Sequence, residues 1–203
     1  MKKISLLMAF LLVFGVAFAA SQPVEGKKFE FSTGLSYEAY SYHYTGAPAG
    51  YSDTQSYFNI PIRFGWFFWK GLELEPELMM TFYHSSYNSG TGYTSSHSET
   101  GDILSGNLLY NFKLNKSHFV PFVLAGFGFG NAIPYGTYAE KYESGAKTTT
   151  PNFGAGVKYV FGNIAALRLE YRYRNFRIKY SGEDGYSEHI ILNTVMLGIC
   201  LFF

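Results

Sequence analysis

The stretch LRLEYRYRNFRIKY (residues 167–180) alternates apolar and charged side chains through its first eight positions. Such an alternation, with a period of two, indicates a β-strand that has one apolar face and one charged face. Leucine and tyrosine occupy the apolar face, while the other face carries three arginines and one glutamate. Beyond Tyr173 the apolar residues Phe176 and Ile178 fall on the opposite parity. We therefore predict a β-bulge at residues 174–175, which would keep the apolar face continuous.

The same period of two recurs along the rest of the chain, and no segment after residue 19 shows a helical pattern. We predict eight strands, at residues 28–44, 55–69, 72–86, 100–114, 119–130, 151–161, 167–180 and 188–203. Strands of soluble sheets are usually ~5–6 residues long, whereas roughly 9–11 tilted residues cross a bilayer. The predicted strands are therefore long enough to cross a membrane and to continue beyond it.

The predicted connections alternate between short and long. Short turns follow the second, fourth and sixth strands, while the other connections are longer, at residues 45–54, 87–99, 133–149 and 181–187. The long connections are rich in Gly, Ser, Thr and Tyr, as solvated loops are. This layout predicts a meander with both chain ends beside the short turns, which is the arrangement of bacterial outer-membrane barrels.

The first residues predict a cleaved secretory signal peptide, residues 1–19. A basic segment (residues 1–3) precedes an apolar segment (residues 4–18), and residues 17–19 fit a small-x-small cleavage site. A transmembrane anchor is the alternative, but the segment is short for one and has the flanks of a signal. We expect the mature chain to begin at Ala20 and residues 20–203 to form one domain.

The composition favours an all-β chain with a large apolar surface. Aromatic residues make up 20% of the chain and charged residues only 15%, below the ~25% of soluble domains. Loss of Lys2 and Lys3 with the signal changes the formal charge from +1 to −1, so we expect no nucleic-acid partner. Cys200 is the only cysteine, which excludes an intramolecular disulfide and a thiolate metal cluster. By parity with its neighbours we expect a buried free thiol.

The alternating faces indicate that apolar side chains point outward and charged side chains point inward. Because lipid tolerates no open sheet edge, such strands must close into a barrel. We therefore predict an all-β fold, an eight-stranded antiparallel up-and-down transmembrane β-barrel. A soluble periplasmic barrel or sandwich is the alternative, but the apolar faces are long, unbroken and bordered by Tyr and Trp, as membrane girdles are.

An eight-stranded barrel is just wide enough for side chains to fill its interior. Because a buried charge without a partner costs several kcal/mol, we predict an interior network of ion pairs. Its candidate members are Arg63, Glu73, Glu75, Glu77, Lys158, Arg168, Glu170, Arg172 and Arg174. Glu30 and Glu38 are further carboxylates that can contribute.

The sequence resembles the small eight-stranded outer-membrane barrels, the group of the OmpA transmembrane domain and OmpX. The resemblance rests on PFVLAGFGFG (residues 121–130), NFGAGVKYVF (residues 152–161), LRLEYRYR (residues 167–174) and TVMLGICLFF (residues 194–203). It covers the whole mature chain. The chain end looks like the C-terminal insertion signal of this group, formed by Val195, Leu197, Ile199, Leu201 and Phe203.

The resemblance implies a monomer in the bacterial outer membrane, with both termini periplasmic. Its partners would be the outer-membrane assembly machinery and the surrounding lipid and lipopolysaccharide. Because the sequence ends at the last strand, we expect no peptidoglycan-binding domain. In this group an interior salt-bridge network can also gate a narrow channel, although a structural polar plug is the simpler interpretation.

One stretch, FYHSSYN (residues 82–88), raises a catalytic hypothesis. Its His84 and Ser86 lie two residues apart on the lipid-facing row, a spacing that resembles the His-x-Ser of outer-membrane lipid A 3-O-deacylases. Glu99 is a candidate third member, because a serine nucleophile needs a histidine base with an acid behind it. The alternative is a strand that turns polar as it leaves the membrane.

Other chemistry finds little support in the sequence. The five histidines lack the spacing of a zinc site, and we predict no metal and no cofactor. The long Tyr- and Ser-rich loops suit contact with an extracellular ligand. We therefore expect a non-enzymatic outer-membrane protein with a structural or surface-contact role. The alternatives are a narrow porin-like channel and the lipid A deacylase.

Overall fold

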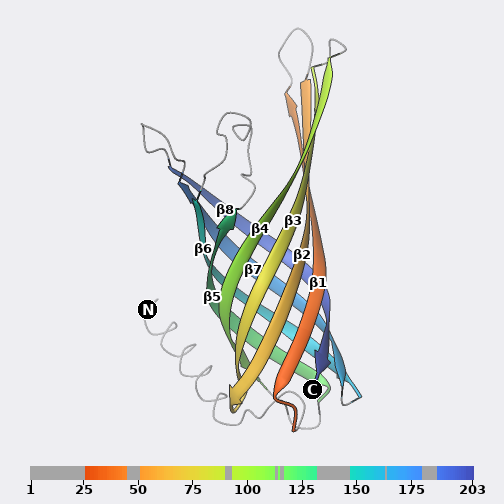
Figure 1. The fold of residues 1–203 in the computed structure, drawn as a ribbon. Helices are drawn as coiled ribbons and strands as arrows, with labels where there is room; N and C mark the ends of the chain where they lie inside the picture. The colour runs from red at the N-terminus through yellow and green to blue at the C-terminus, as the bar shows by residue number, and fades with distance from the viewer. Residues whose placement is uncertain are drawn as a thin grey trace, which may run out of the picture.

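The computed structural model describes residues 26–44, 51–89, 93–112, 114, 117–131, 147–162, 164–179 and 187–203. Eight strands form a closed barrel in which each strand pairs antiparallel with its neighbours in the chain and the first closes on the last (Figure 1). The strands are β1 (Phe29–Tyr44), β2 (Tyr51–Trp69), β3 (Leu72–Asn88), β4 (Thr94–Asn111), β5 (Phe119–Asn131), β6 (Lys147–Phe161), β7 (Ala165–Lys179) and β8 (Ser187–Phe202). The predicted architecture is confirmed.

Several predictions concern residues outside the described ranges. The signal peptide and its cleavage site lie in residues 1–25, and the central parts of the predicted loops lie in residues 45–50, 90–92, 132–146 and 180–186. The turn between β2 and β3 is described. Lys70 and Gly71 form it with φ angles of 27° and 87°, and two consecutive positive φ angles are what a two-residue turn that continues the strand twist requires.

Strands β2, β3 and β4 are longer than the alternation predicted. Tyr44 pairs with Tyr51, Ser52 with Asn88, and Asn88 with Thr94. The upper ends of β1–β4 therefore form a four-stranded sheet beyond the barrel wall (Figure 1). We call residues 39–44, 51–56, 84–88 and 94–100 the projecting sheet. The predicted loops included residues 51–54, 87–88 and 94–99 of this sheet, because cross-strand pairing of Ser and Thr leaves no apolar alternation in the sequence.

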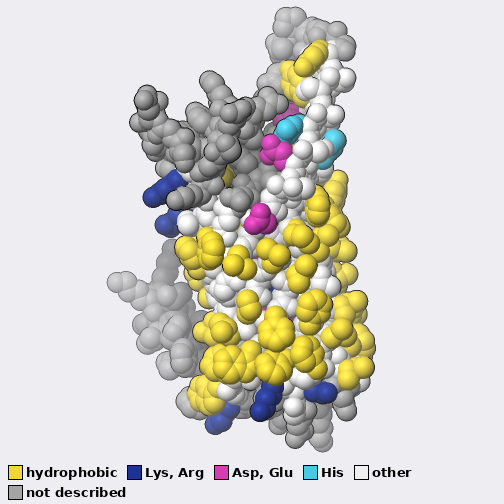
Figure 2. All heavy atoms as spheres, viewed as in Figure 1, with side chains coloured by type: hydrophobic (Ala, Val, Ile, Leu, Met, Phe, Trp, Pro, Cys, Tyr) yellow, Lys and Arg dark blue, Asp and Glu magenta, His cyan; other side chains and the backbone are white. Residues whose placement is uncertain are grey.

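The barrel is apolar outside and largely polar inside. Figure 2 shows a broad band of hydrophobic side chains on the side of the barrel that faces the viewer, and exposed apolar residues occur on all eight strands. On β3 the outward residues Leu74 and Leu78 alternate with the buried Glu73, Glu75 and Glu77. A soluble barrel or sandwich would bury the apolar face, so the exposed band supports the membrane interpretation.

The bulge predicted in β7 is absent, and that prediction was wrong. The pairing of β7 with β8 keeps one register from Ala165–Leu201 to Lys179–Ser187. Phe176 and Ile178 consequently point inward and are 1% and 0% exposed. Their side chains pack in an apolar part of the interior, which we call the loop-end cluster. The strand therefore needs no bulge to place them in an apolar environment. The members of the loop-end cluster are Met79, Ile103, Phe176, Ile178 and Leu192.

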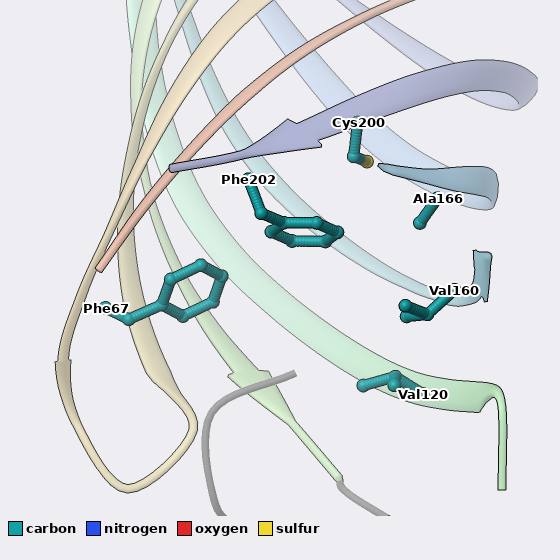
Figure 3. Packing of buried hydrophobic residues seen from close by; sticks show 6 residues of the cluster. All are labelled: Phe67, Val120, Val160, Ala166, Cys200 and Phe202. Atoms are coloured by element: carbon teal, nitrogen blue, oxygen red, sulfur yellow. The ribbon is translucent and has the colours of Figure 1, made fainter. Parts of the chain in front are cut away.

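A second apolar group fills the opposite end of the interior, beside the short turns. Figure 3 shows its side chains, from five different strands, pointing into one space. We call it the turn-end cluster: Phe67, Val120, Val160, Ala166, Cys200 and Phe202. Cys200 is a buried free thiol, as parity predicted. The polar part of the interior lies between these two apolar clusters.

Candidate functional site: the interior charge network

Strands β3 and β7 supply most of the interior charges. In a closed order of eight strands they lie four strands apart, on opposite walls of the barrel. The pleat turns every second residue inward, so β3 presents only carboxylates to the interior between residues 73 and 77, and β7 presents both signs between residues 168 and 174. Opposite charges therefore meet across the lumen.

Two arginines of β7 cross the lumen to reach β3. Arg168 Nη1 lies 2.5 Å from Glu75 Oε2, and Arg172 Nη1 lies 2.8 Å from Glu77 Oε1. From the neighbouring strand β2, Arg63 Nε lies 2.6 Å from Glu77 Oε2. Glu77 is thus held by guanidinium groups from both walls. These charge-assisted contacts connect strands that are far apart around the barrel.

Further pairs run along β7 itself. Glu170 lies between two arginines, with its carboxylate 2.6 Å from Arg168 Nη2 and 2.5 Å from Arg172 Nη2. Arg174 is the most peripheral member, 3.7 Å from Glu77 Oε1. The inward charges of β7 alternate in sign from Arg168 to Arg172, and the surplus positive charge of the strand is met by Glu75 and Glu77 of β3.

A lysine centre occupies the part of the network nearest the turn-end cluster. Lys158 Nζ donates to Glu30 Oε2 at 2.5 Å and to Glu73 Oε2 at 3.0 Å. The same ammonium lies 5.5 Å from the ring centroids of Phe67 and Phe122. The aromatic partners were not predicted, because cation–π geometry depends on which strands face each other.

The network is balanced in formal charge. Its five carboxylates are Glu30, Glu73, Glu75, Glu77 and Glu170, and its five cations are Arg63, Lys158, Arg168, Arg172 and Arg174. Each of these side chains is at most 3% exposed. The structure therefore brings together all nine candidate members and Glu30, one of the two further carboxylates suggested by the sequence. Glu38 lies apart, half-buried, where it accepts hydrogen bonds from Thr194 and Tyr40.

Three carboxylates of the network, Glu30, Glu73 and Glu75, approach one another closely enough to hold a metal ion, with ligand atoms within 4.8 Å. Lys158 and Arg168 already lie against these oxygens. Their ammonium and guanidinium groups supply the positive charge that a metal would bring. The negative charge of the three carboxylates is therefore neutralised by side chains of the barrel itself.

The three residues of the catalytic hypothesis are not brought together. His84 Nδ1 hydrogen bonds to Ser98 Oγ of β4 at 2.9 Å. Glu99 lies on the other face of β4, where its carboxylate is 2.6 Å from His97 Nε2. Around Ser86, strand β3 pairs with β2 on one side and with β4 on the other, so the backbone N–H groups of β3 are engaged in these ladders and do not offer an oxyanion hole beside Ser86.

Comparisons with known proteins agree with this architecture. Residues 9–197 match the family described as "Outer membrane protein beta-barrel domain". The chain belongs to this family. The resemblance to small outer-membrane barrels is thus confirmed, and the protein is an outer-membrane β-barrel. A comparison with functionally characterised proteins returned no significant match.

Two solved structures from Pseudomonas aeruginosa are similar to this outer-membrane barrel. The N-terminal β-barrel domain of OprF is 17% identical, covers 88% of this chain and 100% of its own, and has a TM-score of 0.49. The outer membrane protein OprG is 13% identical, covers 87% of this chain and 97% of its own, and has a TM-score of 0.45. The family match decides the classification.

The last strand of this outer-membrane barrel presents one continuous apolar row to the outside. The row consists of Val195, Leu197, Ile199, Leu201 and Phe203, all of them exposed. Beside it, β8 closes the barrel by pairing with β1 from Glu30–Phe202 to Leu35–Leu197. We propose that this row is the signal read during membrane insertion.

Proposed function

We propose that this outer-membrane barrel is a non-enzymatic surface protein, in which the barrel is a filled membrane anchor and the projecting sheet contacts external molecules. The observation that carries the proposal is the projecting sheet itself. Strands β2, β3 and β4 have 19, 17 and 18 residues, whereas roughly 9–11 residues suffice to cross the bilayer. Ordering the additional paired residues costs conformational entropy, so we infer that the projecting sheet has a function.

The chemistry of the projecting sheet supports contact with polar molecules. Its exposed positions include Ser41, Thr54, Ser86 and Ser96, and hydroxyl groups both donate and accept hydrogen bonds. Serine and tyrosine also dominate surfaces evolved for recognition, because they combine adaptable bonding with large contact area. We place the long loops and the projecting sheet outside the cell and both chain ends in the periplasm, as in other barrels of this kind.

The filled interior supports an anchor rather than a transport path. Rings of Phe67 and Phe202, 6.4 Å apart, lie in the turn-end cluster. The charge network lies next to this cluster on the way to the loop end, and the loop-end cluster lies beyond the network. An ion would have to pass two apolar layers and separate buried ion pairs, each of which is costly to break.

The experiment that tests the proposal shortens the β3–β4 hairpin. Replacing residues 85–97 by Asn-Gly joins His84 to Ser98, which are already opposite each other, through a two-residue turn. Cells that display the intact protein should adhere to an epithelial monolayer, and cells with the shortened hairpin should adhere several-fold less. Folding of both proteins is checked by the heat-dependent shift of the barrel in gel electrophoresis. Equal adhesion by the two correctly folded proteins would refute the proposal.

A further inference from the structure

The two faces of the projecting sheet differ in chemistry. The face that continues the outside of the barrel carries mainly hydroxyl groups, including those of Ser41, Thr54, Ser86 and Ser96. The other face continues the parity of the lumen and carries carboxylates and tyrosines. We call it, together with the row of residues directly below it, the acidic face: Glu38, Tyr40, Asp53, Gln55, Tyr57, Tyr83, Ser85, Tyr87, Ser95, His97 and Glu99.

We infer that the acidic face binds a segment of an external polypeptide that is rich in lysine and arginine. The cationic side chains of this segment pair with the carboxylates of the face and lie against its tyrosine rings. The inference rests on the proposed function, because it names the class of partner that the projecting sheet contacts.

The acidic face has a net negative charge. The sequence contains no Lys or Arg in residues 29–62 or 71–112, the two stretches that supply the sheet. The face carries the carboxylates of Glu38, Asp53 and Glu99, and its one described histidine can supply at most one positive charge. On the side that faces the viewer, Figure 2 shows acidic and histidine side chains on the projecting sheet and no basic ones. A basic partner would therefore complement this charge.

Each of the three carboxylates lies directly opposite a tyrosine on the neighbouring strand. The three pairs are Glu38 with Tyr57, Asp53 with Tyr87, and Glu99 with Tyr83. The Cβ atoms of directly opposite residues lie about 4.5–5.5 Å apart, so one cation can contact a carboxylate and an aromatic ring together. An ion pair combined with a cation–π contact favours Lys and Arg over neutral side chains.

The upper part of this face is accessible to a partner. Tyr57 and Tyr83 are buried below it, whereas Tyr40 is 37% exposed, Tyr87 is half-buried and the Glu99 side chain is 36% exposed. The ring of Tyr40 packs edge-on against Tyr57, with the centroids 6.2 Å apart. Because neighbouring rings hold it in place, little side-chain entropy is lost when a cation binds there.

The spread of the carboxylates fits an extended chain better than a small amine. Glu38 and Glu99 stand in one row across the four strands, three strand spacings or roughly 14 Å apart. An extended polypeptide rises about 3.3 Å per residue. Cations about four residues apart along one chain can therefore reach two of these carboxylates, which a single small amine cannot.

The test measures binding of a fluorescently labelled octalysine peptide to the purified full chain in zwitterionic detergent, by fluorescence anisotropy. The wild type should bind octalysine and should not bind octaglutamate. Asp53→Asn and Glu99→Gln should each weaken octalysine binding about two- to fivefold, the effect of one exposed ion pair. Folding is again checked by the heat-dependent gel shift. Equal binding of octalysine and octaglutamate by the wild type would overturn the inference.

Asp102→Asn is the matched control. It removes the same charge three residues from Glu99, but Asp102 is exposed and has the opposite parity, so it lies on the outer face of β4. This variant should bind octalysine as the wild type does. A loss equal to that of Glu99→Gln would show a general charge effect and would overturn the inference.

A second pair of variants tests the ring contact. Tyr40→Leu should weaken octalysine binding about two- to fivefold, the effect of one exposed cation–π contact. Tyr40→Phe keeps the ring and should bind as the wild type does. Equal binding by the two variants would overturn the ring contact on which the choice of a basic partner depends.

Failure of this inference is distinguishable from failure of the proposed function. The shortened β3–β4 hairpin can reduce adhesion while octalysine binds equally to the wild type and to the chain with both Asp53→Asn and Glu99→Gln. The projecting sheet would then contact another class of partner, and this inference alone would be wrong. Unchanged adhesion after shortening would refute the proposed function, and the external polypeptide partner with it.

Discussion

At the scale of single residues, the interior depends on charge compensation. Lys158 is fully buried and lies against Glu30 and Glu73. Removal of one partner from a buried ion cluster leaves the others uncompensated, which costs far more than the pair itself contributes. The free energy of unfolding should therefore respond to the balance of charge in the network and not to the number of charges.

We expect Lys158→Met to lower the free energy of unfolding by about 3–5 kcal/mol, because two buried carboxylates lose their cation. Adding Glu30→Gln and Glu73→Gln to the same chain should restore most of the loss. The free energy of unfolding of both variants is measured by urea unfolding in detergent, followed by tryptophan fluorescence. Lys70→Met at the exposed turn is the control and should change the free energy by less than about 0.5 kcal/mol. A Lys158→Met protein as stable as the wild type would contradict the compensated network.

At the scale of the elements, the closure of β8 on β1 depends on two glycines. Gly34 and Gly198 are opposite each other, and a Cβ atom on either would meet a carbonyl oxygen of the partner strand, Leu197 O at 2.7 Å in the case of Gly34. This is the seam at which the first and last strands must meet. The two glycines allow the strands to approach there.

We expect Gly198→Ala to destabilise the barrel by about 1–3 kcal/mol through the clash of the new methyl group, and to slow folding into lipid vesicles. Gly106→Ala is the matched control, since no atom lies within 4 Å of a Cβ at that position. Folding is followed by the heat-dependent gel shift over time. Identical behaviour of the two variants would show that close approach at the seam is unimportant.

Apolar alternation along the chain predicts the eight strands correctly, but it does not predict where several of them end or which way Phe176 points. The strand cores followed from alternation, which is a local property. The extension of β3 to Asn88 depends on pairing with Thr94, and polar residues give no periodic signal of it. Phe176 was assigned outward because apolar residues were expected only on the lipid side, whereas the loop-end cluster accommodates it inside.

At the scale of the whole molecule, the interior holds the charge network between the turn-end and loop-end clusters, and a further buried apolar group, Leu109, Phe122 and Leu124, lies beside the network. The network combines side chains from strands on opposite walls, as Arg168 and Glu75 illustrate. We propose that such a lumen keeps the barrel a closed membrane anchor and that contact with external molecules belongs to the projecting sheet. A filled interior of this kind is what the small diameter of eight strands permits.

We expect the purified barrel to show no stepwise conductance in planar bilayers under conditions in which a porin control conducts, because ions would have to break buried pairs. Arg172→Gln and Glu75→Gln should also remain closed, since the two apolar clusters are unchanged. Steady wild-type conductance that changes in either variant would instead identify a narrow channel lined by the network.

Neighbouring residues set the pleat, so the alternation along each strand is enough to predict which of its faces is apolar, and hence a barrel with its apolar side outside and its charges inside. It also identified the charged residues of the interior. The folded barrel is needed to show which of these charges form pairs, that His84 contacts Ser98 and not Ser86, and that the Glu99 carboxylate lies against His97. Those contacts depend on register and on closure of β1 with β8, and both are properties of the whole sheet.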